Sequence, residues 1–362
     1  MRVKLSDITQ YSKGVQINGD ELVDNGDYIY LNGGINPSGR WTESNVGANT
    51  VTISEGGNSS GYINYITEPF WCGAHCYYLF NGPKNTKYLY YALKSQQDRL
   101  LAIRSGACMP NIKKSDLGKF EFEFDINEQK QNEIVATLSR VENVIACRKR
   151  ELELLDDLIK ARFVEMFGDI NINDKNWNCE PLGELCTIVR GGSPRPIEQF
   201  LGGDVPWIKI GDATDGDNIY LNSTKEHIIQ EGVKKSRLVK PGSLIFANCG
   251  VSLGFARIIT FEGCIHDGWL AMEDIDERLD RVFLLQALNQ MTEYFRTIAP
   301  AGTQPNLNTA IMKAYMQVIP PIELQRDYIR FVHQVDKSKV AVQKALDETQ
   351  TLFDSLMQEY FG

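Results

Sequence analysis

Two stretches of the chain carry apolar residues at a heptad spacing. In the first, from Ile126 to Gly168, apolar side chains recur at alternating steps of four and three, and no proline interrupts the pattern. The apolar positions are Ile134, Leu138, Val141, Ile145, Leu152, Leu155 and Ile159, with Arg148 at the one polar step. This spacing predicts a single helix, roughly 60 Å long, whose narrow apolar seam requires a partner helix.

The second stretch, Ile322 to Gly362, supplies that partner within the same chain. Its seam positions are Leu324, Tyr328, Phe331, Val335, Val342, Ala345, Thr349, Leu352 and Leu356, with Ser338 at the polar step. Gln129-Lys130 near the start of the first stretch matches Gln325-Arg326, a step of 196 residues, whereas Gly168 matches Gly362, a step of 194. The mismatch predicts a two-residue deletion in the second copy.

The repeat extends beyond the helices. Matching segments occur in the same order in both halves, and they are 5–14 with 182–191, 28–32 with 205–209, 51–61 with 244–254, 90–93 with 285–288, and 110–112 with 305–307. Short apolar runs that enter glycine-rich turns predict strands, and the matched order indicates a duplicated α+β unit. We therefore expect a globule at residues 1–124, a helix at 125–169, a second globule at 170–320 and a second helix at 321–362.

The lengths of these parts predict the topology. The polar segment from Asn171 to Asn178 is too short to return the chain along the first helix. The second helix can then pack on the first only by running back, as an antiparallel intramolecular coiled coil with an approximate two-fold axis. Such an arrangement offers two similar docking faces and suits a target with two half-sites.

Charge and cysteine content narrow the class of protein. The net charge is −9, and none of the four segments is net positive, so any contact with nucleic acid must come from local patches. The eight cysteines form no CxxC pair, which favours reduced thiols and a cytoplasmic location. We expect no signal peptide and no membrane span, since no run of 18 apolar residues occurs.

Together these features resemble the DNA-specificity subunit of type I restriction-modification systems. The resemblance rests on the order globule–helix–globule–helix and on several sequence features. These are the segments 5–14 and 182–191, which open the two globules and end at Lys13-Gly14 and Arg190-Gly191, the segment from Gly302 to Leu307, and the helix starts at Gln129-Lys130 and Gln325-Arg326. The first copy departs from the pattern, because residues 106–112 lack the Thr and Gln of the second copy. Any role carried by those two side chains is therefore absent from the first globule.

The resemblance implies a function as well as a fold. Each globule is a target-recognition domain that reads one half of a bipartite sequence in double-stranded DNA. The helices act as a spacer and dock two modification (methyltransferase) subunits, and restriction subunits are further candidate partners. The subunit itself is non-catalytic and binds no cofactor, since S-adenosylmethionine belongs to the modification subunits.

Candidate DNA contacts are the cationic, amide, hydroxyl and aromatic residues in and beside the glycine-rich loops. In the first globule they are Lys13, Arg40, Trp41, Asn58, Ser59, Ser60 and His75. In the second they are Arg190, Arg195, Lys209, Asn248, Ser252, Arg257 and His266, together with the basic run Lys234, Lys235 and Arg237, which suits phosphate more than bases. His75 and His266 occupy roughly equivalent places in the two copies.

Enzymatic alternatives fit the residues poorly. The loop from Glu55 to Gly61 lacks the Gly-Lys-Ser/Thr of a phosphate-binding loop, and Asn36-Pro37-Ser38 is not the Asn-Pro-Pro-aromatic motif of an adenine methyltransferase. Cys72, His75 and Cys76 lack a fourth metal ligand. The alternative from another class is a coiled-coil scaffold that binds proteins and not DNA, which the acidic balance favours slightly. Duplex binding distinguishes the two.

Overall fold

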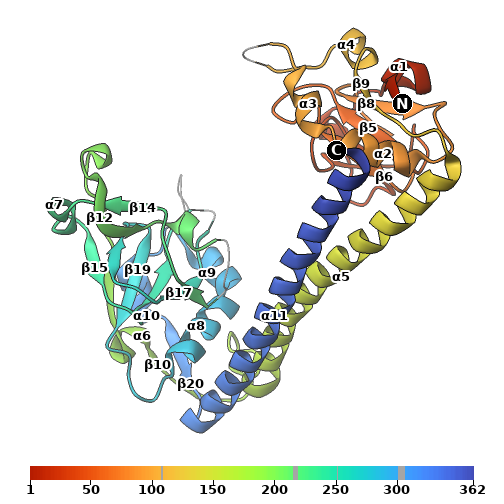
Figure 1. Ribbon diagram of the computed structural model, residues 1–362. Helices are drawn as coiled ribbons and strands as arrows, with labels where there is room; N and C mark the ends of the chain where they lie inside the picture. The colour runs from red at the N-terminus through yellow and green to blue at the C-terminus, as the bar shows by residue number, and fades with distance from the viewer. Residues whose placement is uncertain (107–108, 215–218, 251, 301–305) are drawn as a thin grey trace. The chain divides into compact units, whose positions relative to one another are not determined.

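The structure, a computed structural model, describes residues 1–106, 109–214, 219–250, 252–300 and 306–362 (Figure 1). The chain divides into two compact units. Unit 1 comprises residues 1–150 and 343–362, and unit 2 comprises residues 151–342. Each unit therefore combines one globule with a part of each long helix.

Unit 1 is built on an antiparallel four-stranded sheet with the order β2–β8–β5–β6. These strands span Gln10–Lys13, Cys76–Phe80, Thr50–Ser54 and Ile63–Ile66. A smaller sheet pairs β3 (Tyr28–Leu31) with β4 (Gly39–Trp41) and, in parallel, with β7 (Trp71–Cys72), while β1 (Arg2–Lys4) pairs with β9 (Glu121–Glu123). The helices are α1 (Leu5–Ile8), α2 (Thr86–Lys94), α3 (Gln97–Ala102), α4 (Lys114–Gly118) and the 3-10 turn η1 (Gly19–Glu21).

Unit 2 has a five-stranded sheet with the order β11–β19–β16–β17–β13. These strands span Thr187–Arg190, Trp269–Glu273, Leu244–Ala247, Ala256–Ile259 and Tyr220–Leu221. The second sheet has the order β14–β12–β18–β15, over Glu226–Ile228, Leu201–Ile208, Gly263–Ile265 and Arg237–Val239, and β10 (Asn178–Pro181) pairs with β20 (Met316–Ile319). The helices are α6 (Leu182–Leu185), α7 (Gln230–Val233), α8 (Arg281–Gln290), α9 (Thr292–Ile298), α10 (Thr309–Ala314) and the turns η2 (Ile197–Gln199) and η3 (Ile210–Asp212).

The two units repeat one topology, which confirms the predicted duplicated α+β fold. The order β2–β8–β5–β6 in unit 1 recurs as β11–β19–β16–β17 in unit 2. The parallel pair β3–β7 recurs as β12–β18, and β1–β9 recurs as β10–β20. Among the described residues, β13 and β15 are additions of unit 2 that have no counterpart strand in unit 1.

The long helices correct one sequence prediction. Helix α5 spans Glu128–Phe167 and α11 spans Ile322–Phe361, and each has 40 residues, so the offset between them is 194 throughout. No two-residue deletion exists. The counterpart of Gln325 is therefore Gln131 and not the exposed Gln129. Gln131 and Gln325 are both buried, and each donates from Nε2 to a main-chain carbonyl just before its helix. The acceptors are Asp125 O at 2.6 Å for Gln131 and Pro320 O at 2.7 Å for Gln325.

The two helices pack antiparallel within each unit. In unit 1 the buried Ile134 and Leu138 share a core with Phe361, near the far end of α11. Arg148, at the predicted polar step, donates to the main chain of Ala345 and to Thr349. In unit 2 the core residues Ile159 and Phe163 meet Tyr328 and Val332, and Lys339 pairs with Asp156 at 2.7 Å. The predicted antiparallel seam is thus confirmed in both units.

Two predicted seam positions of the second helix, the polar Ser338 and the apolar Leu352, lie outside the seam. Leu352 is 51% exposed, and the neighbouring Phe353 packs against the core of unit 1 in its place. A straight helix drifts by about 20° per heptad relative to a strict seven-residue repeat. Four heptads separate Leu324 from Leu352, which amounts to a drift of roughly 80°, so the following residue faces inward.

A short helix lies between the main sheet and the long helices in each unit. In unit 1, α2 packs on β5 and β6, and the hydroxyl of its buried Tyr91 donates to Glu142 of α5 at 2.5 Å. In unit 2, α8 packs on β17, and its Phe283 stacks on Phe163 of α5 at 5.7 Å between ring centroids. Each unit is therefore layered as sheet, short helix and long-helix pair.

Candidate nucleic-acid interface

In unit 1, two main-chain hydrogen bonds hold Glu55 at the point where β5 leads into the glycine-rich loop from Glu55 to Gly61. The N–H of Glu55, the residue after β5, donates to His75 O at 2.8 Å, and Ile112 N–H donates to Glu55 O at 2.9 Å. Gly57 and Gly61 both have positive φ (76° and 84°), a conformation that glycine adopts without steric cost. The sequence around Glu55 therefore forms a tight loop at the end of β5.

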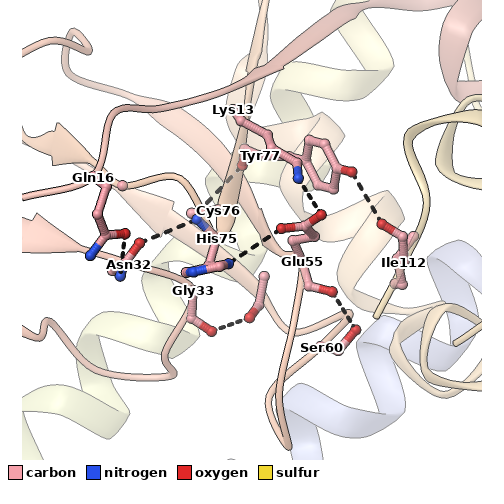
Figure 2. A network of polar contacts seen from close by, with 12 residues as sticks. Lys13, Gln16, Asn32, Gly33, Glu55, Ser60, His75, Cys76, Tyr77 and Ile112 are labelled. Atoms are coloured by element: carbon pink, nitrogen blue, oxygen red, sulfur yellow. Dashed lines mark hydrogen bonds and ion pairs between the residues drawn. The ribbon is translucent and has the colours of Figure 1, made fainter. Parts of the chain in front are cut away.

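The side chain of Glu55 holds two predicted contact residues together, as Figure 2 shows. One carboxylate oxygen pairs with Lys13 Nζ, and the other lies 3.5 Å from His75 Nδ1. Lys13 and His75 are 41% and 62% exposed at their side chains, whereas Glu55 is only 16% exposed. Two accessible groups are thus positioned by a carboxylate beneath them.

The end of β3 and the residues after it join the same site. Asn32 accepts a hydrogen bond at Oδ1 from His75 N–H at 3.2 Å, and its Nδ2 donates to Gln16 at 3.1 Å (Figure 2). The hydroxyl of Ser59 donates to Gly33 O at 2.6 Å. Residues from the main sheet and the smaller sheet therefore converge on one polar surface.

Other predicted residues of unit 1 lie elsewhere. Arg40 and Trp41 belong to β4 in the smaller sheet. Arg40 donates to the main chain of Gly26 and Asp27, and Trp41 packs edge-on against Trp71 at 6.3 Å. These contacts give both residues a structural role, while part of each side chain remains accessible.

The two main-chain hydrogen bonds at Glu55, here called the main-chain frame, recur in unit 2 with different side chains. Asn248 N–H donates to Gly268 O at 3.0 Å, and Leu307 N–H donates to Asn248 O at 2.8 Å. Asn248 is therefore the counterpart of Glu55, and Gly268 that of His75. His266 lies two residues before Gly268. The two histidines therefore belong to equivalent loops, but they do not occupy equivalent positions in them.

The cationic residues of unit 2 gather around Asp267. Arg190 Nε donates to the main-chain oxygen of Asp267 at 3.1 Å, and Arg195 Nη2 lies 3.5 Å from its carboxylate. Ser193 Oγ donates to Asp267 Oδ1 at 2.7 Å. Asp267 thus organises two of the predicted arginines, as Glu55 organises Lys13 and His75 in unit 1.

His266 and Lys209 form the other side of this cluster. The His266 ring contacts Trp207 at 6.1 Å, and Lys209 Nζ lies 5.7 Å from the Trp207 ring while it pairs with Glu226. Burial lowers the pKa of His266, and its Nδ1 accepts from Gly268 N–H at 2.9 Å. The neutral ring therefore carries its proton on Nε2, which faces Asp267 at 3.6 Å.

The basic run adjoins the same loop. Lys234, Lys235 and Arg237 are exposed. Ser236, between them, donates to Gly192 O at 2.7 Å, and Lys235 Nζ lies 4.5 Å from the ring of Phe200. The run therefore extends the cationic surface that begins at Arg190.

Three predicted contacts are buried. Ser60 and Asn248 are 0% exposed and Arg257 is 8% exposed. Ser60 donates to Glu55 O and Asn248 donates to Leu307 O, so both brace their loops. Arg257, on β17, lies opposite Ile245 in the sheet, with its guanidinium 4.8 Å from the ring of Phe255, and it also lines a cavity of about 230 Å³. Ser252 is partly buried and Asn58 is exposed.

Neither of the two organising carboxylates is among the contacts predicted from the sequence. Glu55 directly follows the buried strand Thr50–Ser54, and Asp267 directly follows His266. The search favoured cations because DNA is anionic, although an acid directly after a buried strand is a recognisable feature. Residues 302–305, which contributed to the family resemblance, lie outside the described residues.

Two further properties concern metals and membranes. Within the described ranges, no group of three or more His, Cys, Asp or Glu side chains is arranged to hold a metal ion. Cys72 and Cys76 are buried in an apolar cluster with Leu31 and Phe70. No described helix is both long enough and apolar enough to cross a membrane.

Comparison with known proteins identifies the family. The model of the type I restriction modification DNA specificity domain matches residues 1–156 and 174–349. A Mycoplasma genitalium protein assigned as a type I specificity subunit is 26% identical over 366 residues, covering 96% of this chain and 90% of its own length.

A crystal structure of a type I restriction-modification S subunit from M. genitalium has the same fold, with a TM-score of 0.61, 23% identity, and coverage of 100% of this chain and 96% of that one. A structure from work on complex assembly and conformational transition of the type I system has a TM-score of 0.60 at 15% identity, covering 99% and 96%. The chain belongs to the type I restriction-modification DNA specificity family, and it is the non-catalytic specificity component of such a system.

Proposed function

We propose that the chain reads a bipartite target in double-stranded DNA, with residues 1–124 and 170–320 as its two recognition domains. The observation that carries the proposal is the duplicated frame at Glu55 and Asn248, because each copy lies beneath exposed cationic residues. The family model matches both copies separately. Two similar modules in one chain suit a target with two half-sites.

We further propose that the long helices dock two modification subunits, and two exposed leucines support this. Leu158 in unit 2 and Leu352 in unit 1 are separated by 194 residues, so they occupy the same position in the repeated helix. They are 46% and 51% exposed. An exposed leucine that recurs at one position of a duplicated helix favours two equivalent partner sites, one for each modification subunit. Those subunits bring the S-adenosylmethionine.

The test is to express the chain with the modification subunits encoded beside it and to sequence the methylated sites. We expect a two-part motif with a fixed gap, and a purified complex with one copy of this chain and two modification subunits by native mass spectrometry. A complex that binds no duplex DNA at low salt, yet retains its protein partners, would support the scaffold alternative and contradict the proposal.

A further inference from the structure

A pocket of about 490 Å³ in unit 2 contains the Asp267 carboxylate. The segment from Ser193 to Glu198 forms one wall, and Trp207, His266 and Asp267 form the rest of the lining. The Asp267 side chain is 39% exposed, so it faces solvent from a fixed position. The pocket lies within the cationic cluster proposed to meet DNA.

The carboxylate is ionised and held in place. Although burial alone would raise it, the pKa of Asp267 is lowered by the hydrogen bond from Ser193 and by the nearby charges of Arg195 and Arg190. Ser193 fixes one oxygen at 2.7 Å, while Arg195 lies 3.5 Å from the other. An ionised carboxylate only accepts hydrogen bonds, and this one retains acceptor capacity toward the pocket.

Trp207 belongs to the lining of the same pocket. Trp207 is 5% exposed, and within the described part of the chain its indole N–H has no hydrogen-bond acceptor. A buried donor without an acceptor is uncommon and costs stability. Because the indole nitrogen has almost no accessible surface, a ligand in the pocket would meet the Asp267 carboxylate and not this N–H.

A carboxylate near DNA is repelled by phosphates unless it meets a donor. The donors that bases present in the major groove are the exocyclic amino groups of cytosine (N4) and adenine (N6), and Asp and Glu accept from such groups. Arg190 and Arg195, whose charges lie near this carboxylate, offset the repulsion from the backbone. Phosphate contact and amino-group reading are thus combined in one surface.

We propose that Asp267 is a specificity-determining residue that accepts a hydrogen bond from the exocyclic amino group of a cytosine or adenine in the half-site read by unit 2. The inference rests on the proposed function. Unit 1 has no such group, because the shared register places Ala74 at the equivalent position. Recognition of an exocyclic amino group by a carboxylate at this position is therefore expected in the half-site read by unit 2 only.

The test uses the full chain with its modification subunits and a library of randomised duplexes. Asp267→Asn removes the charge but keeps an oxygen for Ser193, and Asn adds a donor. We expect it to reduce discrimination at one base pair of one half-site by roughly tenfold or more. Glu277→Gln, which removes one exposed charge of unit 2 outside the pocket lining, is the control and should leave the motif unchanged.

A second measurement acts on the DNA and keeps the test independent of the variant's folding. At the base pair identified, the cytosine is replaced by 2-pyrimidinone or the adenine by purine, each of which lacks the amino group. The wild-type complex should lose roughly tenfold in affinity, and the base whose replacement has this effect identifies the ligand. Asp267→Asn should lose nothing further.

Two results would overturn the assignment. One is an unchanged motif for Asp267→Asn, and the other is full affinity of the wild type for every duplex that lacks an amino group. If the wild-type complex shows no sequence preference at all, the proposed function fails first, and the assignment fails with it.

Discussion

The two units share a main-chain frame and differ in the side chain at its centre. In unit 1 Glu55 is partly accessible and pairs with Lys13 and His75, whereas its counterpart Asn248 is fully buried and braces Leu307. The bonds from these two residues to the neighbouring strand and to the segment before α4 or α10 are the same in both units. Duplication has therefore kept the scaffold and changed the groups it presents. Under the proposed function, this difference predicts two half-sites of different sequence.

The largest expected difference between the units is in stability. Phe163 is fully buried in unit 2 among Phe167, Phe283 and Tyr328, whereas its counterpart in the repeated helix, Met357, is only partly buried in unit 1. Phe163→Ala should cost about 3–5 kcal/mol of unfolding free energy, and Met357→Ala under about 2 kcal/mol. Urea denaturation of both variants measures this, and equal losses would contradict the comparison.

The exposed leucines test whether the units are equivalent as docking sites. Leu158→Glu and Leu352→Glu each place a charge at the same position of the repeated helix. Each should remove one modification subunit, with an affinity loss of about 30-fold for an interface hot spot. Native mass spectrometry should show one partner lost in each variant and both lost in the double variant. Asn143→Glu, at an exposed polar position of α5, is the control and should keep both.

The basic run tests a feature that only unit 2 has. Strand β15, which contains Arg237, has no counterpart among the described strands of unit 1. Replacing Lys234, Lys235 and Arg237 with Ala should weaken binding to all sequences and reduce the slope of log affinity against log salt by about 2–3 units. Binding isotherms at several salt concentrations measure the slope. An unchanged slope would exclude the run from the interface.

The smallest expected effect concerns the carboxylate of unit 1. Glu55→Gln keeps the main-chain bonds at this position but frees Lys13 from its ion pair. If Lys13 then meets one phosphate, the salt slope should become steeper by about one unit. Glu68→Gln removes an exposed charge elsewhere in unit 1 and should leave the slope unaltered. Weaker binding by the Glu55 variant would show that the carboxylate positions Lys13 rather than restraining it.

The sequence predicted the architecture well because burial follows periodicity. The seam residues Ile134, Leu138 and Ile159 are buried as predicted, and the repeated segments coincide with equivalent strands. The errors have physical causes. Leu352 fails because helix geometry drifts from the heptad, and Gln129 was matched in place of Gln131 because sequence identity at a helix start does not report burial.

The candidate site was harder to predict, because side-chain direction in a loop has no periodicity. Asn248 and Asn58 come from corresponding glycine-rich segments, yet one is buried and the other exposed. No sequence pattern identifies Glu55 and Asp267 as organising residues, because their role is to hold neighbouring cationic side chains through hydrogen bonds and ion pairs. Only the structure relates an acid to the cations that it holds.

The central claim is that each unit reads its own half-site. Methylated sites should be sequenced from cells that express, with the modification subunits, the wild type, a Lys13→Ala/His75→Ala variant of unit 1, or an Arg190→Ala variant of unit 2. We predict that the unit 1 variant alters base preference or efficiency through one half of the motif only, and that the unit 2 variant does so through the other half, with the gap between halves unchanged. A single contiguous motif, or variants of either unit that disturb both halves alike, would contradict the claim.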